Sequence, residues 1–250
     1  MTLLIALTEG VLTLTLNRPE KRNALDSALI EALHQALDRA DLDAAVRVVV
    51  VRGAGRDFCA GADLEELLDS ALRTMEDNER AALRLGRLFV RMRELPKPVV
   101  ALVQGRALAG GAGLATGCDL VLACETAQFG YPEIQRGFVP AMVMTMLRRL
   151  TGERRAFDLV ATGRLLPAAE ALEYGLVSRV IPEAVFESAA AAVVAGLACS
   201  SASALALTKR LLYELDGQSF SEGIALGARV NALARAHPDF RTAISAFLKQ

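Results

Sequence analysis

Cysteine and histidine, the residues most often used for metal binding and nucleophilic catalysis, are few in this chain of 250 residues. None of the four cysteines forms a CxxC pair, and the only histidines are His34 and His237. Because these residues lack the spacing of a zinc site, no metal site is expected. His34 falls on the polar side of a predicted helix and His237 precedes Pro238 at a turn, so both have structural interpretations. They leave few ways to build a Ser-His or Cys-His nucleophile pair.

Two turns of small residues each lead from an apolar strand pattern into a helix. The first is Phe58-Cys-Ala-Gly-Ala-Asp63, where Asp63 and Glu66 have the spacing of a capping box. The amides around Ala62 are therefore expected at a helix N-terminus. Gly110 and Gly111 occupy the equivalent place in the second turn. Two such helix starts can each lend one N–H to a single carbonyl oxygen and stabilise an enolate or a tetrahedral oxyanion, although such turns also serve for close packing.

The elements that position these turns follow from hydrophobic periodicity. Residues 11–16 alternate apolar with polar and predict a half-buried strand. Residues 46–51, apart from Arg47, and residues 98–103 are apolar runs typical of buried strands. Shorter strands are expected at 120–124 and 128–130. Between the first two strands, Asp26 or Ser27 caps a helix that has a leucine at every fourth position. Repetition of strand, tight turn and helix predicts the α/β class, with a parallel sheet and right-handed crossovers.

The chain after Pro140 is predicted to be nearly all helical. These helices have too few polar faces to stand alone, which indicates packing on the sheet or on a neighbouring subunit. Residues 188–208 carry no charge and approach the length of a bilayer span. Their alanines and serines make them weakly apolar, and Ser200-Ser201-Ala202-Ser203 predicts a break between two helices. The predicted helices are 142–150, 167–174, 184–197, 204–215 and 220–236.

Composition argues against several classes of protein. Apolar residues make up 53% of the chain, charged residues 23%, and the net charge is -1, the balance of an ordinary soluble globular protein. No long Lys/Arg cluster provides a basic face, so nucleic acid is not the expected partner. The first ten residues lack the basic flank and long apolar core of a signal peptide. We therefore expect a cytoplasmic protein without a membrane anchor.

Five motifs occur in an order that resembles the enoyl-CoA hydratase/isomerase (crotonase) superfamily. The loop Leu16-Asn-Arg-Pro-Glu-Lys-Arg-Asn-Ala-Leu25 is similar to the family's CoA-contacting loop. His237-Pro-Asp-Phe-Arg241 followed by Ala246-Phe-Leu248 resembles its final helix. The resemblance covers essentially the whole chain. The five motifs are Phe58-Cys-Ala-Gly-Ala-Asp63, Leu108-Ala-Gly-Gly-Ala-Gly-Leu114, Cys118-Asp-Leu-Val-Leu-Ala123, Ala127-Gln-Phe-Gly-Tyr-Pro-Glu133 and Gly175-Leu-Val-Ser-Arg-Val180.

The resemblance implies a crotonase-like spiral of ββα units over residues 1–195, containing an acyl-CoA site. It implies a helical trimerisation region over residues 196–250, and hence a homotrimer or homohexamer. The implied substrates are acyl-CoA thioesters. No metal or redox cofactor is implied, since coenzyme A enters as part of the substrate.

The resemblance also implies roles for particular residues. The N–H groups of Ala62 and Gly110 match the oxyanion hole for the thioester oxygen, which acidifies the α-carbon by stabilising the developing enolate. Further positions match contacts of the substrate and its CoA moiety, partly through backbone atoms. These positions are Arg22, Ala24, Ala60, Asp63 and Leu64.

One of the family's two catalytic glutamates is matched and the other is missing. Glu133 matches the glutamate after the Phe-Gly-x-Pro sequence, and neighbours such as Phe129 and Phe138 predict an apolar environment that raises its pKa. Gly113 stands at the position of the other glutamate, so ordinary two-carboxylate hydration is in doubt.

Three enzymatic hypotheses remain. We rank first a one-glutamate enoyl-CoA hydratase, in which Asp63, Glu65 or Tyr131 helps to orient water; some bacterial methylglutaconyl-CoA hydratase-like sequences resemble this Gly-Gly-x-Gly-Leu form. A 3-enoyl/2-enoyl-CoA isomerase that uses Glu133 as its single proton shuttle is mechanistically as well served. An NAD(P)-binding oxidoreductase ranks last, because Gly117 lies one residue beyond the dinucleotide fingerprint. RNA binding, known by analogy within the superfamily, has little support from the charge.

The sequence leaves the acyl chain length, its branching and the pathway open. The wall of the acyl pocket is expected from residues 67–85 and 138–146.

Overall fold

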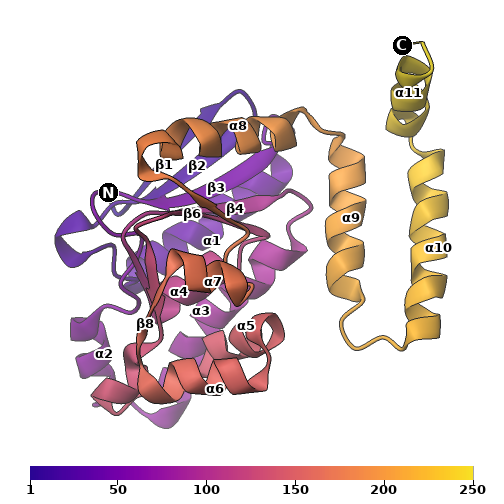
Figure 1. Cartoon of the computed structure of the whole chain (residues 1–250). Helices are drawn as coiled ribbons and strands as arrows, with labels where there is room; N and C mark the ends of the chain where they lie inside the picture. The colour runs from indigo at the N-terminus through magenta and orange to yellow at the C-terminus, as the bar shows by residue number, and fades with distance from the viewer. Residues whose placement is uncertain (250) are drawn as a thin grey trace.

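The computed structural model describes residues 1–249 and has the predicted α/β class (Figure 1). Six strands form one sheet in the order β1-β2-β3-β4-β6-β9, and three form a second sheet in the order β5-β7-β8. The strands of the larger sheet are β1 (Leu3–Thr8), β2 (Val11–Leu16), β3 (Val48–Gly53), β4 (Val99–Val103), β6 (Leu120–Cys124) and β9 (Arg179–Ile181). Those of the smaller sheet are β5 (Arg106–Leu108), β7 (Gln128–Gly130) and β8 (Leu165–Pro167).

The larger sheet is parallel from β2 to β9, as the strand pattern predicted. β3 and β4 are almost wholly buried, whereas β2 alternates between buried and half-buried residues. β1 was not predicted. It pairs antiparallel with β2 through a tight turn at Glu9 and Gly10, both of which have positive φ, the conformation that favours a two-residue hairpin.

Three successive turns of the chain repeat one plan, which confirms the ββα expectation. β4 leads to β5 and α4 (Gly110–Thr116), and β6 leads to β7 and the 3-10 helix η2 (Pro132–Arg136). In the first turn β3 leads to Cys59, which bridges Ala107 of β5, and then to α2 (Leu64–Ser70). Each turn therefore passes from the larger sheet to the smaller one and ends in a helix.

Helix α1 (Ser27–Leu42) is capped by Asp26, whose side chain accepts from the Leu29 N–H at 2.7 Å. Of the two predicted caps, Asp26 is thus the one used. Leu29, Leu33 and Leu37 are buried along one face of the helix. Burial of each such side chain contributes about 1.5–3 kcal/mol before entropy is counted, so this face fixes the helix against the sheet.

The predicted capping box at α2 is wrong, although the helix does begin where expected. The Asp63 side chain accepts from the Glu65 N–H at 3.0 Å. In a capping box the Glu66 side chain would accept from the Asp63 N–H. This N–H donates to the Leu25 carbonyl at 2.9 Å instead. Glu66 therefore accepts from the N–H and hydroxyl of Ser27, at 3.0 and 2.9 Å.

The remaining helices cover the sheets. The 3-10 helices η1 (Pro19–Lys21) and η3 (Glu183–Val185) begin two of the connections. Two helices were not among those predicted, α3 (Met75–Glu94) and α6 (Glu153–Thr162), and Pro167 belongs to β8 rather than to the helix after it. The predicted helices appear as α5 (Ala141–Thr151), α7 (Ala168–Glu173), α8 (Phe186–Cys199), α9 (Ala202–Glu214) and α10 (Phe220–Ala236), followed by α11 (Pro238–Phe247).

Helix α9 stands beside the body of the molecule, and α10 and α11 lie on the far side of α9 (Figure 1). The predicted break lies at Ser200 and Ser201, where the chain bends by 102° between η3–α8 and α9. Within residues 1–249 no single helix is long and apolar enough to cross a membrane, and only this bent pair passes the test of length and composition. The predicted boundary at 195/196 falls inside α8, and the trimerisation role of the segment stays a prediction.

Candidate functional site

A cavity of about 630 Å³ lies where the three turns end. Its wall includes parts of both segments that were predicted to form the acyl pocket, among them Leu85 of α3 and residues 138–143. Glu133, Gly110 and Ala62 also line it. So do all five residues that the resemblance assigned to substrate and CoA contacts: Arg22, Ala24, Ala60, Asp63 and Leu64.

The spiral explains why the three chemical groups meet. Cys59, Ala107 and Phe129 lie side by side, because Cys59 bridges Ala107 and Ala107 pairs in parallel with Phe129. Ala62 lies three residues after Cys59, and Gly110 lies three residues after Ala107. Glu133 lies four residues after Phe129, at the start of η2. The candidate groups therefore come from equivalent places in three stacked turns.

The Ala62 amide points away from the neighbouring chain segment. Leu25 donates to the Gly61 carbonyl at 2.8 Å and accepts from the Asp63 N–H at 2.9 Å. In a parallel pair this pattern directs the N–H of the intervening residue, Ala62, to the opposite side. Among residues 1–249 neither the Ala62 N–H nor the Gly110 N–H has a hydrogen-bond acceptor. Both amides are therefore available to an incoming oxygen at the cavity.

A residue with positive φ precedes each of these amides. Gly61 has φ 92° and Ala109 has φ 52°, an uncommon conformation for a residue that carries a Cβ. The two residues abut: a Cβ added to Gly61 would lie 2.8 Å from the Ala109 Cβ and 2.9 Å from the Leu108 carbonyl oxygen. The first two turns of the spiral can approach this closely only with glycine at position 61. Their approach brings the Ala62 and Gly110 amides together.

Glu133 is a carboxylate in a largely dry setting. Its exposed fraction is 8%, and its Oε2 atom is buried without a hydrogen-bond partner in the described residues. Burial raises the pKa of this carboxyl, and a hydrogen bond from its own backbone N–H and the positive charge of Arg136 oppose the shift only in part. The predicted rise in pKa is confirmed in direction, as expected of a group that exchanges protons near neutral pH.

Three of the four cysteines are buried, and both histidines make structural contacts. Cys59 is buried, and burial raises the pKa of its thiol to about 12, so it is not a nucleophile at neutral pH. His34 Nε2 lies 2.9 Å from the Arg84 carbonyl oxygen, and His237 caps α11. In the part of the chain that the structure describes, no three His, Cys, Asp or Glu side chains are grouped so that they could hold a metal ion.

Comparison with known proteins decides the family. A family model described as enoyl-CoA hydratase/isomerase matches residues 6–250. A Thermus thermophilus protein provisionally named enoyl-CoA hydratase is 44% identical over 235 residues, which cover 94% of this chain and 93% of the relative. The 2,3-dehydroadipyl-CoA hydratase of Escherichia coli K12 is 36% identical and covers 99% of this chain and 96% of its own. The chain belongs to the enoyl-CoA hydratase/isomerase family.

Solved structures of the family have the same fold. The crystal structure of an enoyl-CoA hydratase from Mycobacterium smegmatis matches with a TM-score of 0.95 at 33% identity, covering 100% of this chain and 96% of that one. The crotonase-like spiral that the resemblance implied is therefore confirmed. The roles of the individual site residues stay predictions, because a shared fold does not assign them.

Gly113, the position that the resemblance matched to the missing glutamate, lies behind the cavity wall and does not line it. A Cβ built on Gly113 would lie 2.3 Å from Val143 Cγ1 and 3.2 Å from the Phe89 ring. Val143 comes from α5 and itself lines the cavity. Val143 therefore occupies the space into which a side chain at position 113 would project, a contact that the sequence motif alone did not reveal.

The three residues suggested as helpers for water orientation are placed differently. Tyr131 is 1% exposed and does not line the cavity, so the structure argues against that role for it. Glu65 lines the cavity but is paired with Lys21 at 2.6 Å. Asp63 also lines it, but its carboxylate faces Arg18 at 2.8 Å. The hydrogen bond from Arg18 is the main reason that the pKa of Asp63 is lowered, which keeps it an anion rather than a proton carrier.

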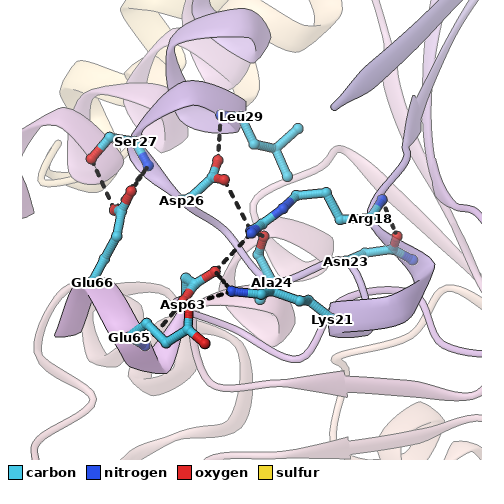
Figure 2. A network of polar contacts seen from close by, with 10 residues as sticks. All are labelled: Arg18, Lys21, Asn23, Ala24, Asp26, Ser27, Leu29, Asp63, Glu65 and Glu66. Atoms are coloured by element: carbon cyan, nitrogen blue, oxygen red, sulfur yellow. Dashed lines mark hydrogen bonds and ion pairs between the residues drawn. The ribbon is translucent and has the colours of Figure 1, made fainter. Parts of the chain in front are cut away.

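A polar network around Arg18 was missed at the level of sequence (Figure 2). The Arg18 guanidinium contacts Asp63, Asp26 and the Ala24 carbonyl, at 2.8, 3.1 and 2.7 Å. From the sequence, Arg18 was named only as part of the loop that resembles the family's CoA-contacting loop. The available signal was that two predicted helix caps, Asp26 and Asp63, are both acidic.

Proposed function

We propose that this protein is an enoyl-CoA hydratase that adds water across the double bond of a 2-enoyl-CoA thioester. The observation that carries the proposal is the convergence of two acceptor-free amides and one buried carboxyl on a single cavity. Ala62 and Gly110 supply the amides, and Glu133 supplies the carboxyl. Family membership supports thioesters of coenzyme A as the substrate class.

The amides of Ala62 and Gly110 bind the thioester oxygen. Charge develops on this oxygen when a nucleophile adds to C3 or a proton leaves the α-carbon, so donors fixed beforehand lower the barrier. The helix N-terminus at Gly110 adds a favourable partial positive charge. Catalysis therefore requires no metal or redox cofactor beyond the CoA of the substrate.

Glu133 moves the proton. Its carboxylate accepts a proton from water as the hydroxide oxygen bonds to C3, which leaves an enolate at the thioester oxygen. The protonated Glu133 then gives that proton to C2, and the carboxylate is restored. One carboxyl suffices because the proton removed from water is the proton delivered to carbon.

An isomerase is the second candidate, and the absence of a side chain at Gly113 favours it. With a 3-enoyl thioester, Glu133 removes a proton from C2 and returns it to C4. The double bond then lies between C2 and C3, and the amides hold the intermediate dienolate. No water is positioned in this reaction, so a second carboxylate has no task.

The two ends of the cavity suit the two parts of the substrate. Arg22, Ala24 and Ala60 are proposed to contact the CoA moiety, with Asp63 and Leu64 beside them. The wall formed by α3 and residues 138–143 is proposed to enclose the acyl group.

The cytoplasm, predicted from the N-terminal sequence, is the proposed location of the protein.

One assay separates the two candidates. Purified protein is given a trans-2-enoyl-CoA and a 3-enoyl-CoA of equal chain length, and water addition to the first is compared with conjugation of the second. We expect hydration to be the faster reaction. Conjugation of the second without hydration of the first would make the protein an isomerase, and calorimetric binding of NAD but not of acetoacetyl-CoA would reject both candidates.

A further inference from the structure

Arg18 connects the parts of the site without lining the cavity. It precedes the loop of residues 19–25, which carries Lys21, Arg22 and Ala24 along the cavity wall. Its own N–H donates to Asn23 Oδ1 at 3.0 Å, so the loop closes back on it. A residue in this position can act on a ligand only through its neighbours.

The loop 19–25 runs beside the segment that holds the proposed oxyanion amide. The Ala60 N–H donates to the Arg22 carbonyl at 3.0 Å, and Leu25 exchanges hydrogen bonds with Gly61 and Asp63, at 2.8 and 2.9 Å. Any displacement of the loop therefore moves the backbone on both sides of Ala62.

The Arg18 side chain adds further contacts between the loop 19–25 and the segment 60–63. One guanidinium nitrogen donates to the Ala24 carbonyl of the loop at 2.7 Å, and the other donates to Asp63, at 2.8 Å. A third contact reaches Asp26 at 3.1 Å, the cap of α1. Arg18 and Asp63 have exposed side-chain fractions of 11% and 5%, so water screens their pairing little (Figure 2).

The charge of Arg18 also matters for the reaction. Asp63 follows Ala62 directly, and an unpaired carboxylate there would repel the negative charge that develops on the thioester oxygen. Arg18 compensates this charge while leaving Asp63 free to cap α2 through its other oxygen, 3.0 Å from the Glu65 nitrogen.

We propose that Arg18 is a positioning residue: it ties the loop 19–25 to the segment 60–63, so that CoA bound on the loop fixes the Ala62 amide for the thioester oxygen. This role rests on the proposed function. It implies that binding of the distant CoA nucleotide improves stabilisation of the enolate, a use of remote binding energy at the reacting centre.

The test compares acetoacetyl-CoA with acetoacetyl-pantetheine, which lacks the nucleotide, by the near-ultraviolet absorbance of the bound enolate at saturation. The unmodified protein should give a clearly stronger enolate band with acetoacetyl-CoA. In Arg18→Gln that band should fall about tenfold, and the two thioesters should differ by less than about twofold, because the coupling is lost. Arg18→Lys, which keeps the charge but not the forked geometry, should fall in between.

Arg52→Gln is the matched control, since Arg52 pairs with Glu187 at 2.6 Å between β3 and α8 and does not line the cavity. Its enolate bands should match those of the unmodified protein. If Arg18→Gln does not fold, Asp63→Asn retains the cap oxygen and should give the same loss of coupling.

A folded Arg18→Gln that keeps the band and the difference between the two thioesters would overturn the role of Arg18 alone. Absence of any enolate band in the unmodified protein would overturn the proposed oxyanion site as well.

Discussion

The buried carboxyl of Glu133 links catalysis to stability. Its pKa is raised by burial, so the folded state binds the proton more tightly than the unfolded state does. The stabilisation by this proton is fully present below the ordinary pKa of 4.5 and is lost as the pH rises through the raised value. Above the raised pKa the protein therefore maintains a desolvated charge that a neutral side chain would avoid.

Glu133→Gln should accordingly be more stable than the unmodified protein at pH 7. The advantage should shrink as the pH falls towards 4, where both side chains are neutral. Thermal unfolding of both proteins across this range measures the difference. The quantity to compare is the stability of the Gln variant minus that of the unmodified protein. If this difference is smaller at pH 7 than at pH 4, the raised pKa of Glu133 is contradicted.

Gly113 and Val143 form a second testable unit at the residue scale. Gly113→Glu alone should lose about 1–3 kcal/mol of stability, because its Cβ would lie 2.3 Å from Val143 Cγ1. The double variant Gly113→Glu with Val143→Ala should recover part of this loss and raise hydration relative to isomerisation. Denaturant unfolding and the paired enoyl-CoA assays measure the two effects. If the folded double variant hydrates more slowly than the unmodified protein, water is already positioned by other groups.

At the scale of elements, hydrophobic periodicity predicted the central strands well because burial on both faces leaves an uninterrupted apolar run, as in β3 and β4. It missed β1, whose residues after Leu3 are all exposed, and it missed α3, whose buried residues lie among many charged ones. The residue types at the turns predicted the amides around Ala62 and at Gly110 as candidates, whereas Glu133 came from the resemblance to the family. The network of Arg18 and the packing of Val143 could not be predicted, because they depend on contacts between segments far apart in the sequence.

Helix α9 is held to the body by a buried ion pair. Lys209 has 7% of its side chain exposed; it pairs with Asp119 at 2.7 Å and donates to the Met92 and Lys97 carbonyls, at 2.7 and 2.9 Å. Tyr213, one turn further along α9, donates to the same carboxylate at 2.8 Å. These contacts orient the start of the C-terminal helices.

Lys209→Met should therefore destabilise the protein by about 3 kcal/mol, since it leaves Asp119 largely buried without its cation. Arg210→Gln is the control on the same helix. Arg210 forms an exposed ion pair with Glu214 at 2.6 Å, and loss of this pair should lower the free energy of unfolding by less than about 0.5 kcal/mol. Urea unfolding gives both values, and equal losses would mean that the buried pair does not anchor α9.

At the scale of the whole molecule, the body has one continuous core whereas α10 and α11 contain no buried residue. These two helices nevertheless carry large apolar side chains, among them Phe220, which is 87% exposed, and Phe247, which is 73% exposed. An apolar surface of this kind is typical of a subunit interface. In an oligomer with closed symmetry, every subunit buries this surface against a neighbour, so no copy of it stays exposed to water.

We therefore predict a homotrimer or a homohexamer built from two trimers. Sedimentation at micromolar concentration measures the mass directly, and Ile244→Asp, which places a charge on the exposed face of α11, should shift the protein towards monomer. A stable monomer of the unmodified chain would contradict the predicted role of residues 196–250.

The central claim is that Glu133 alone carries the proton, and turnover of Glu133→Gln with a trans-2-enoyl-CoA tests it most directly. Turnover should fall by about a hundredfold or more, while affinity for acetoacetyl-CoA stays within about threefold, because only the transfer of the proton is removed. Glu153→Gln, which changes an exposed carboxylate on α6, is the matched control and should keep full activity. Unchanged turnover in a folded Glu133→Gln that binds acetoacetyl-CoA would contradict the account.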